Sequence, residues 1–352
     1  MSDDKTLAET LARQGVSRRT FLKFCATMAS LMAMPPTMAA EMAEKLAKVR
    51  RQSVIYLSFQ ECTGCLESLT RSHSPTIESL MFNAISLDYQ DTLMAASGTA
   101  AEAARETAMK ENYGKYLLVV DGSVPMKDGG VYSTSAGVTN HDTLVEVAKG
   151  AAAIITVGTC AAFGGIPKAN PNPTGAVPVS AIIKDKPIVN VSGCPPIPVV
   201  MAGVIAQILT LGTIPELDQH GRPKVFFGDT IHDRCYRRPF YDQGKFAKSF
   251  DDEGARNGWC LYELGCKGPT TYNACATTKW DGGVSFPIES GHPCLGCSQP
   301  DFWDAGSFYA PLSTGDWGSG TVLAAGVAAG AAIGIGAALA ARKRQDTIGG
   351  GK

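Results

Sequence analysis

Short runs of apolar, mostly β-branched residues divide the first 200 or so residues of the chain. The runs lie at 53–59, 116–120, 152–157 and 187–191. Segments with helical periodicity lie between or after them, near 66–80, 93–110, 142–149 and 199–211. Apolar strands that alternate with helices are typical of a parallel sheet covered on both faces. The pattern therefore predicts an α/β domain with a parallel sheet over residues 50–215.

The pattern changes after about residue 211. Residues 220–315 are rich in glycine, proline, aromatic residues and cysteine, and they show little periodicity. A segment of this kind cannot bury a regular apolar face. We therefore expect a second, irregular domain over residues 216–315 that is held together by whatever its cysteines bind.

The N-terminal segment has the order of features of an export signal. Arg18 and Arg19 are followed by Phe-Leu-Lys, a modestly apolar stretch over 24–34 and small residues at 37–40. This order predicts a twin-arginine signal peptide over residues 1–43, read by the twin-arginine translocase. Such export carries folded proteins, which suits a protein that receives a cofactor beforehand. The alternative is an ordinary amphipathic first helix with a chance arginine pair.

A second uncharged segment lies near the C-terminus. Residues 321–341 carry no charge, and the basic cluster at 342–344 follows at once. A helix of this length can span a bilayer core of about 30 Å. The basic cluster would place the C-terminus in the cytoplasm and the body of the protein outside it. We therefore predict a transmembrane anchor over 321–341, with a flexible Ala/Gly tail as the alternative.

Charge and cysteine content narrow the classes of function. The 32 basic and 33 acidic residues give a net charge of −1, so nothing favours a nucleic-acid partner. Eleven cysteines are many for 352 residues, and one of them, Cys25, lies in the predicted signal. The remaining cysteines indicate metal centres or disulfides.

Four of these cysteines directly follow predicted strands. Cys62-x2-Cys65 follows the first run, Cys160 the third and Cys194 the fourth. The carboxyl ends of parallel strands meet at one edge of a sheet, where such folds bind ligands. We therefore expect these four thiols to converge and to form a metal or cluster site.

Two further sets lie in the irregular segment. They are His232-x2-Cys235 with Cys260-x5-Cys266, and Cys275 with Cys294-x2-Cys297. Thiolates are the natural ligands of iron–sulfur clusters, and a histidine can replace one of them. A site with only three thiolates suits a cluster of three irons. Five disulfides, structural zinc and a single thioredoxin-like motif remain the alternatives.

The motifs around these residues resemble those of a known family. They are QECTGCLESL, VVDGSVP, GTCAAFGG, NPTGA, SGCPPIP, IHDRC, GWCLYELGCKGP and GHPCLGC. Together with the two ends of the chain, they are similar to the small, electron-transferring subunit of membrane-bound nickel–iron uptake hydrogenases.

The resemblance implies a fold and a set of cofactors. The first domain would be flavodoxin-like and would hold a proximal [4Fe-4S] cluster through Cys62, Cys65, Cys160 and Cys194. A distal [4Fe-4S] cluster would be held by His232, Cys235, Cys260 and Cys266. A medial [3Fe-4S] cluster would be held by Cys275, Cys294 and Cys297.

The resemblance also implies partners and a location. Hydrogen would be split at a nickel–iron centre in a separate large subunit, and this chain would supply no catalytic residue. Electrons would pass through the three clusters to a membrane cytochrome b or another quinone-reducing subunit. The protein would lie on the periplasmic side of the bacterial inner membrane, where two heterodimers could associate.

Individual residues refine this expectation. Oxygen-tolerant members of the family carry two extra cysteines, at positions that are Gly64 and Gly165 here, so we expect an ordinary cubane and an oxygen-sensitive enzyme. Pro287 is similar to a family proline that stands where a fourth medial ligand would be. Glu61 is either an interface carboxylate that relays protons or a solvated charge at a strand end. His292 is expected to form a hydrogen bond in its loop and not to bind a cluster.

Two other classes of function remain open from the sequence. A stand-alone periplasmic iron–sulfur electron carrier would share the cluster motifs but need no large subunit. A disulfide-stapled exported scaffold would contain neither iron nor sulfide. Metal analysis and the presence of a nickel-containing partner separate these three possibilities.

Overall fold

The computed structural model describes residues 18–31, 35, 37, 51–73, 76–80 and 85–312. The chain divides into two units, residues 1–310 and 311–352, and every element described below belongs to the first unit. The predicted domain boundary near residue 215 stays a prediction; below, it marks only a change in the regularity of the backbone.

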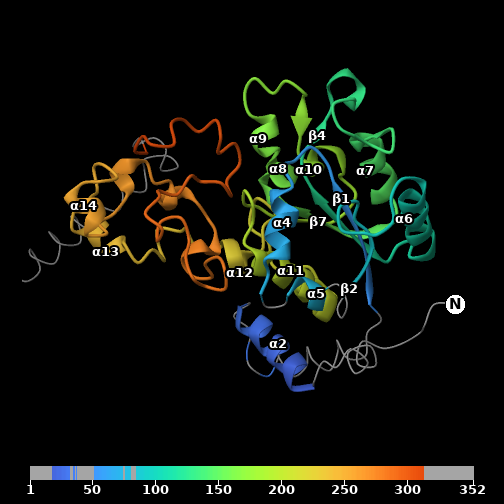
Figure 1. The fold of residues 1–352 in the computed structure, drawn as a ribbon, viewed down its shortest axis with the longest axis horizontal. Coiled ribbons are helices and arrows are strands. Elements are labelled where there is room, and N and C mark those ends of the chain that lie inside the picture. Colours follow the sequence, from blue (N-terminus) through green and yellow to red (C-terminus); the bar gives the residue numbers. More distant parts are fainter. Residues whose placement is uncertain are drawn as a thin grey trace, which may run out of the picture. The chain divides into compact units, whose positions relative to one another are not determined.

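A five-stranded parallel sheet forms the centre of the regular region (Figure 1). Its strands, in spatial order, are β2 (Ile85–Tyr89), β1 (Gln52–Ser58), β3 (Tyr116–Asp121), β7 (Ala151–Val157) and β9 (Ile188–Val191). All neighbouring pairs are parallel. In chain order of these five strands, the arrangement is 2-1-3-4-5, which is the order of doubly wound flavodoxin-like sheets. The predicted α/β fold with a parallel sheet is confirmed.

The strands form because both faces of the sheet are buried. Val54, Tyr56 and Leu117 point into one apolar cluster, whereas Ile55 and Leu118 point into the cluster on the other face. This alternation follows from the two-residue period of a strand. Burial on both faces explains why these runs are apolar at nearly every position.

Helices cover the two faces. Their bounds are α4 (Gly64–Thr70), α6 (Thr99–Glu111), α7 (Asn140–Ala148) and α11 (Pro198–Leu211). Residues of α4 and α11 belong to the first cluster, and residues of α6 and α7 belong to the second. The Thr139 hydroxyl caps α7 by accepting a hydrogen bond of 3.1 Å from the backbone N–H of Asp142.

Shorter elements complete the regular region. They are the strand pairs β4 (Val124–Pro125) with β8 (Ala176–Val177) and β5 (Thr134–Ser135) with β6 (Val138–Thr139), the helices α8 (Gly158–Phe163), α9 (Gly165–Lys168) and α10 (Val179–Ile182), and the 3-10 turn η2 (Lys127–Gly130). They lie in the connections between the main strands.

Two local predictions differ from the structure. The helix expected over residues 66–80 ends at Thr70, and only the single turn α5 (Ile77–Ser79) follows it. Strand β2 was not predicted at all. It lies at the edge of the sheet, its central residues are only half-buried, and polar Ser86 and Asp88 interrupt its apolar pattern.

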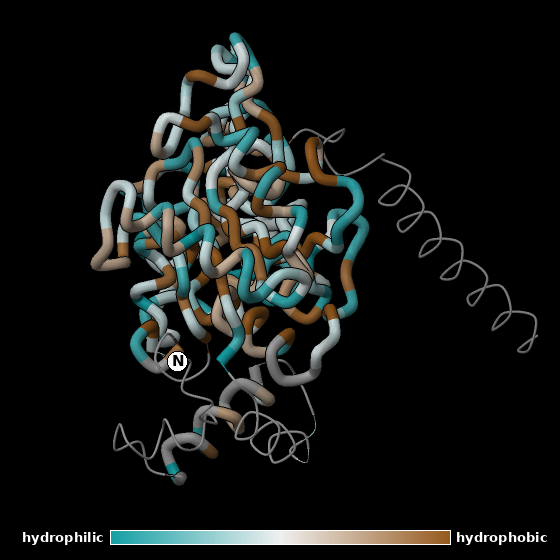
Figure 2. The backbone as a smooth tube through the Cα atoms, turned by 90° about the vertical axis from the view of Figure 1, so that its right-hand side faces the viewer, coloured by the Kyte–Doolittle hydropathy of each residue, from teal (hydrophilic) through white to brown (hydrophobic). Residues whose placement is uncertain are grey.

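Residues 213–310 contain only short helices and turns. These are α12 (Lys224–Phe227), α13 (Arg238–Asp242), α14 (Glu253–Arg256), η3 (Tyr262–Leu264), η4 (Gly268–Thr270) and η5 (Ala274–Ala276). The irregular character that the sequence predicted is confirmed. Buried Phe227, Ile231 and Leu261 join the apolar cluster that contains α4 and α11. Figure 2 shows apolar backbone segments running through the middle of the body.

Helix α2 (Arg18–Leu31) packs against this same cluster. Cys25 and Ala29, one turn apart, are buried beside residues of α11, whereas Arg19 is exposed. The export function of this segment stays a prediction.

Among the helices that the structure describes, none combines the length and the apolar character needed to cross a membrane. The anchor predicted at 321–341 lies outside the described residues.

Candidate functional site

The first set of cysteines lies at the carboxyl edge of the sheet. Cys62 and Cys65 follow β1, Cys160 lies in α8 directly after β7, and Cys194 follows β9. The Cys65 thiol interacts electrostatically with Cys160 and Cys194, and the Cys160 thiol interacts with Cys62. The structure therefore brings these four residues together, as the strand ends predicted.

Glycines keep space open around these sulfurs. A Cβ atom on Gly158, which has a φ of +88°, would lie 2.4 Å from the Cys65 Sγ. A Cβ on Gly165 would lie 2.7 Å from the Cys160 Sγ, and one on Gly64 would lie 3.2 Å from the Cys62 Sγ. Because a side chain at these positions would occupy the space beside the thiols, the cradle fits a bound group that fills it.

Burial makes these thiols difficult to ionise. It raises the pKa of Cys160 to about 11 and that of Cys194 to about 12, and it raises the pKa of Cys65 well above the ordinary value. A bound metal or cluster would offset this cost because it binds the thiolate form. Only Cys62 is exposed, so the site opens toward the surface on the side of Cys62 and its neighbour Glu61.

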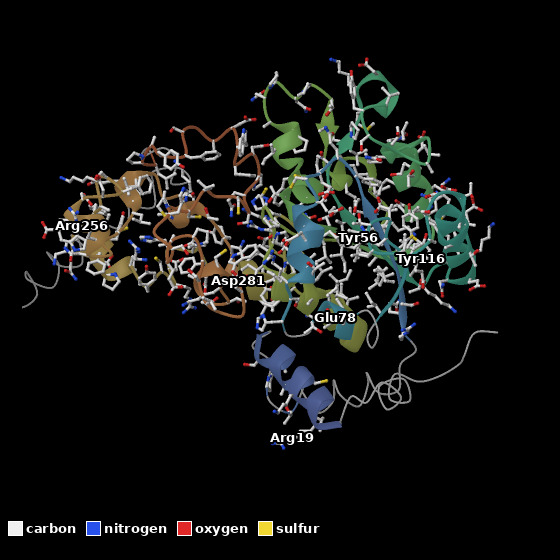
Figure 3. All side chains as sticks on the ribbon, viewed as in Figure 1. Arg19, Tyr56, Glu78, Tyr116, Arg256 and Asp281 are labelled. Carbon is white, nitrogen blue, oxygen red and sulfur yellow. The ribbon has the colours of Figure 1, made fainter. Side chains whose placement is uncertain are left out.

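A buried acid near this site was not predicted. Asp121 ends β3, has no exposed surface, and accepts a hydrogen bond of 3.1 Å from the hydroxyl of Tyr56 on β1. Figure 3 shows Tyr56 within the sheet region. Burial, followed by the charge of Glu61, raises the pKa of Asp121 to about 7. The one signal in the sequence was a carboxylate that ends an otherwise apolar run.

Glu61 itself is half-buried. Burial raises its pKa, a hydrogen bond from the backbone N–H of Thr63 opposes that rise, and the charge of Asp91 adds to it. Its role as an interface or relay residue stays a prediction.

The third set of cysteines shares one cavity. Cys275, Cys294 and Cys297 line a cavity of about 170 Å³. Burial raises the pKa of Cys275 to about 12 and that of Cys294 well above its ordinary value. Pro287 lines the same cavity, whose remaining wall is mostly apolar. Three convergent sulfurs and a proline in one enclosed space fit a group with three protein ligands.

The second set is assembled from loops. Burial raises the pKa of the Cys260 thiol to about 11, and the charges of Cys266 and Cys235 add to that rise. The backbone of His232 donates a hydrogen bond of 3.2 Å to the carbonyl of Gly268. A Cβ on Gly268 would lie 3.3 Å from the Cys266 Sγ, so His232 is placed beside this thiol.

The surroundings of His232 favour the neutral imidazole. Burial, together with the charge of Arg238, lowers its pKa and so favours the neutral ring. Its ring also packs edge-on against Tyr241, with 4.6 Å between the centroids. A neutral imidazole is the form that binds metals.

Direct contacts join the three sets in one order. Cys194 lines the cavity of the third set, and its thiol interacts electrostatically with that of Cys297. On the other side, the backbone N–H of Cys294 donates to the Cys266 Sγ at 3.4 Å. The backbone N–H of Lys267 donates to the Cys294 carbonyl at 2.8 Å. The third set therefore lies between the first and the second.

All eleven cysteines belong to the described residues, and every one is a free thiol. Within residues 18–31, 35, 37, 51–73, 76–80 and 85–312, no three His, Cys, Asp or Glu side chains lie close enough to hold one metal ion. Ligands of an iron–sulfur cluster bind separate irons, so a cluster does not need that single-ion geometry.

His292 also lines the cavity of the third set, but both of its ring nitrogens have partners. Its Nδ1 lies 2.8 Å from the Pro293 carbonyl, and its Nε2 lies 3.2 Å from the Tyr309 hydroxyl. The expectation that His292 forms hydrogen bonds in its loop is confirmed.

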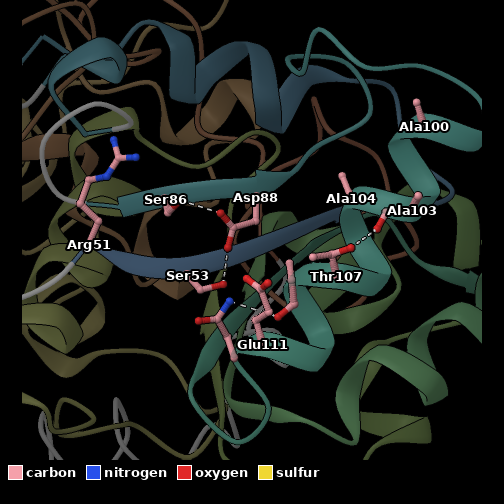
Figure 4. Close-up of a pocket in the computed structure, with 11 residues that line it drawn as sticks. Arg51, Ser53, Ser86, Asp88, Ala100, Ala103, Ala104, Thr107 and Glu111 are labelled. Carbon is pink, nitrogen blue, oxygen red and sulfur yellow. Dashed lines mark hydrogen bonds between the residues drawn. The ribbon is translucent and has the colours of Figure 1, made fainter. Parts of the chain in front are cut away.

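A larger, more open cavity of about 610 Å³ lies at the other end of β1, beside β2 and α6 (Figure 4). Asp88 accepts hydrogen bonds of 2.5 Å from Ser53 and from Ser86 in its wall. No cysteine or histidine lines this cavity, so it is separate from the three thiol sets.

Comparisons with known proteins cover both regions. Residues 62–208 match the family model described as NADH ubiquinone oxidoreductase, 20 Kd subunit. Residues 227–310 match the model of the C-terminal part of the NiFe/NiFeSe hydrogenase small subunit.

Individual relatives match over most of their length. The uptake hydrogenase small subunit of Azotobacter vinelandii is 48% identical over 341 residues, which cover 97% of this chain and 95% of the relative. That of Cupriavidus necator is 50% identical over 309 residues, covering 88% and 86%. A crystal structure of the reduced, active Ni-Fe-Se hydrogenase from Desulfomicrobium baculatum matches with a TM-score of 0.69 at 35% identity, covering 75% of this chain and 100% of that one.

Proposed function

Because the chain belongs to the small-subunit family of nickel–iron hydrogenases, we propose that it conducts electrons from a nickel–iron site in a large subunit toward the membrane. The enzyme oxidises H2 to protons and electrons, and this chain supplies the path for the electrons. The observation that carries the proposal is the contact order of the thiol sets. Cys194 lies against Cys297, and Cys294 lies against Cys266.

The cluster assignment follows the three sets. Cys62, Cys65, Cys160 and Cys194 hold a proximal [4Fe-4S] cluster, and His232, Cys235, Cys260 and Cys266 hold a distal one. Cys275, Cys294 and Cys297 hold a medial [3Fe-4S] cluster. Support for three irons comes from Pro287, which lies in the wall of the medial cavity and has no side-chain atom that can bind iron.

Bound clusters supply one-electron oxidation and reduction, and the chain controls their surroundings. Buried apolar residues exclude water from the medial cavity. Backbone N–H groups also point at ligand sulfurs: that of Gly296 donates to the Cys294 Sγ at 3.4 Å, and that of Arg237 donates to the Cys235 Sγ at 3.4 Å. Hydrogen bonds to cluster sulfurs favour the more negative, reduced state.

The proximal site is of the ordinary, oxygen-sensitive kind in this proposal. Gly64 and Gly165 are the positions whose side chains would reach the Cys62 and Cys160 sulfurs, and neither position carries a thiol. At Gly165 the φ of +55° and a distance of 2.8 Å from a Cβ to the Cys160 backbone also disfavour any side chain.

The exposed Cys62 and the half-buried Glu61 mark the side on which the large subunit docks. A docked partner would cover the open side of the proximal site. At the other end of the path, a membrane cytochrome b or another quinone-reducing subunit accepts the electrons from the distal site.

Export and anchoring complete the proposal. Arg18 and Arg19 direct the folded, cluster-loaded chain through the twin-arginine translocase. Residues 321–341 then hold it on the periplasmic side of the inner membrane with a cytoplasmic C-terminus. A deletion of 321–352 should release the enzyme from membranes into the periplasmic fraction, and Arg18→Lys with Arg19→Lys should keep it in the cytoplasm.

Low-temperature electron paramagnetic resonance with metal analysis of the purified native complex tests the central proposal. We expect about eleven irons in this chain, from two [4Fe-4S] clusters and one [3Fe-4S] cluster, and nickel in the partner. A [3Fe-4S] signal should appear on oxidation.

Other results would identify other functions. A cluster-loaded chain that purifies without any nickel subunit would be a stand-alone electron carrier. An iron-free protein would end the cluster assignment, and a [4Fe-3S] signature would end the ordinary proximal cubane.

A further inference from the structure

Hydrogen bonds join the loop at Cys297 and Ser298, which we call the medial loop, to the segments that carry the proximal cysteines Cys160 and Cys194. The carbonyl groups of Cys297 and Ser298 are the anchor points, and Ser298 has no exposed surface. Three buried side chains, Thr159, Ser192 and Arg222, donate hydrogen bonds to these two carbonyls. Each donor lies more than 70 residues from the loop that it holds, so the bonds join separate parts of the chain.

Thr159 directly precedes the proximal ligand Cys160. Its hydroxyl donates to the Cys297 carbonyl at 2.5 Å and accepts from the backbone N–H of Gly193 at 3.0 Å. Its backbone N–H donates to the Gly193 carbonyl at 2.9 Å. One residue thereby links the loop of Cys160, the loop of Cys194 and the medial loop.

Ser192 follows β9 and lies two residues before the proximal ligand Cys194. Its hydroxyl donates to the Ser298 carbonyl at 2.8 Å, and the side chain has no exposed surface. The rigid end of a buried strand therefore fixes the position of the medial loop.

Arg222 donates the second hydrogen bond to the Ser298 carbonyl, from its Nη1 at 3.1 Å. The guanidinium is almost fully buried, pairs with Asp218 at 2.8 Å, and lies over the rings of Phe227 and Tyr272. The ion pair and the two aromatic rings restrict the orientation of the planar guanidinium, so Arg222 donates to the carbonyl from a fixed position.

We propose that Thr159, Ser192 and Arg222 are positioning residues that set the separation of the proximal and medial clusters. The inference rests on the cluster assignment proposed above. The rate of electron tunnelling falls steeply with distance, so a small displacement of the medial loop slows transfer. Removing the Thr159 hydroxyl leaves the Cys297 carbonyl without this partner, and removing Ser192 or Arg222 leaves the Ser298 carbonyl with one side-chain donor instead of two. A buried carbonyl that loses a donor favours such a displacement.

Thr159→Val and Ser192→Ala in the purified heterodimer test the proposal. Thr159→Val keeps the shape of the side chain and removes the hydroxyl. The matched control is Thr143→Val, because Thr143 is equally buried, lies on α7 against the opposite face of the sheet, and has no hydrogen-bond partner for its hydroxyl. Thr159→Ser keeps the hydroxyl and should rescue the effect.

Three readouts separate the possible explanations. Iron content shows whether the clusters are bound. The magnetic interaction between the proximal and medial clusters, measured by electron paramagnetic resonance in the reduced enzyme, reports their separation. Exchange of H2 with deuterated water needs only the nickel–iron site, whereas reduction of an electron acceptor by H2 needs the whole path.

With full iron content, we expect a weaker magnetic interaction and a several-fold slower reduction of the acceptor in Thr159→Val, with isotope exchange unchanged. Thr143→Val and Thr159→Ser should match the parent protein. An unchanged interaction and an unchanged rate at full iron content would overturn the inference.

If Thr159→Val fails to retain iron, Ser192→Ala is used in its place. A weaker magnetic interaction with slower reduction of the acceptor would support the inference, and no change in either would overturn it. Lack of iron in the parent protein would instead overturn the cluster assignment itself.

Discussion

Residues 51–212 and residues 213–310 each hold four candidate cluster ligands or more, but they position them by different means. In the first region, Cys160 and Cys194 directly follow buried strands, so the hydrogen bonds of the sheet fix their places. In the second, Cys260 and Cys266 lie in loops, and no helix described there exceeds five residues. Regular secondary structure thus supports one site, whereas the other depends on loop contacts and on what its ligands bind.

The two regions should differ in whether they fold before they bind a metal centre. We expect the sheet to fold without a bound group, because an apolar cluster covers each of its faces, and its strand ends then present thiols. Residues 213–310 contain few long apolar runs. In such segments the binding energy of a metal centre becomes folding energy.

Removal of iron should therefore give the largest difference in stability between the two regions. We expect the amide of Lys267 to exchange its hydrogen at least about 100-fold faster in the iron-free chain, which corresponds to about 2.8 kcal/mol. The amide of Val119 in β3 should keep its protection. Hydrogen exchange followed by mass spectrometry measures both, and equal loss in both regions would refute the distinction.

A matched pair of core substitutions sharpens the comparison. Ile155→Ala in β7 should cost about 2–5 kcal/mol of unfolding free energy with or without iron, because it leaves a cavity in a sheet that stays folded. Leu261→Ala should cost a similar amount only in the iron-loaded chain. Denaturant unfolding of both variants in both states measures this. An equal cost for Leu261→Ala in the iron-free chain would mean that its region folds unaided.

The acid buried at the sheet edge should give the sheet region its own pH dependence. The raised pKa of Asp121, about 7 against an ordinary 3.8, means that the folded state favours the protonated carboxyl. Its contribution is complete below about pH 4 and is lost as the pH rises through 7, a change of about 2–4 kcal/mol at about 1.4 kcal/mol per unit.

Denaturant unfolding of the iron-free chain between pH 4 and 8 tests this, and Asp121→Asn should flatten the slope. Asp142→Asn is the control. Hydrogen bonds with His141 and Thr139 lower the pKa of Asp142, so this carboxyl titrates at lower pH than Asp121 does. A slope that survives in Asp121→Asn would place its origin elsewhere.

The smallest effect is expected where the two regions meet at the surface. Lys168 and Asp301 form an ion pair at 2.7 Å, but 38% and 63% of their side-chain surfaces are exposed. Asp301→Asn should lower the unfolding free energy by less than about 1 kcal/mol. The backbone of residue 301 is left-handed, with a φ of 52°, which asparagine tolerates. A larger loss in thermal unfolding would show that exposed pairs hold the regions together.

The convergence of Cys62, Cys65, Cys160 and Cys194 could be predicted because the information for it is local. Four apolar runs identified β1, β3, β7 and β9. Once these strands were identified, the cysteines that follow β1, β7 and β9 were expected at the same edge of the sheet. Strand β2 escaped because an edge strand with Asp88 and Ser86 lacks a continuous apolar pattern. Asp121 escaped because its contact with Tyr56 depends on the pairing of β1 with β3, which no single segment encodes.

In the second region, the sequence predicted the irregular backbone, and the candidate ligands there stay a prediction. The contact of Cys194 with Cys297 joins residues about 100 positions apart, and the bond from Thr159 to Cys297 spans 138. Local patterns do not specify which loops meet. The motif resemblance implied the ligand sets and the middle position of Cys275, Cys294 and Cys297, whereas no local pattern encodes either.

The position of the medial loop also has a consequence for biosynthesis. A ribosome produces the candidate ligands of the proximal site first and His232 to Cys266 next, and only then Cys275, Cys294 and Cys297. In space, however, these last residues lie between the other two sets. The proposed medial site is thus the last of the three to be translated. A nascent chain released before residue 297 would contain the candidate ligands of the two outer sites but would lack the site between them.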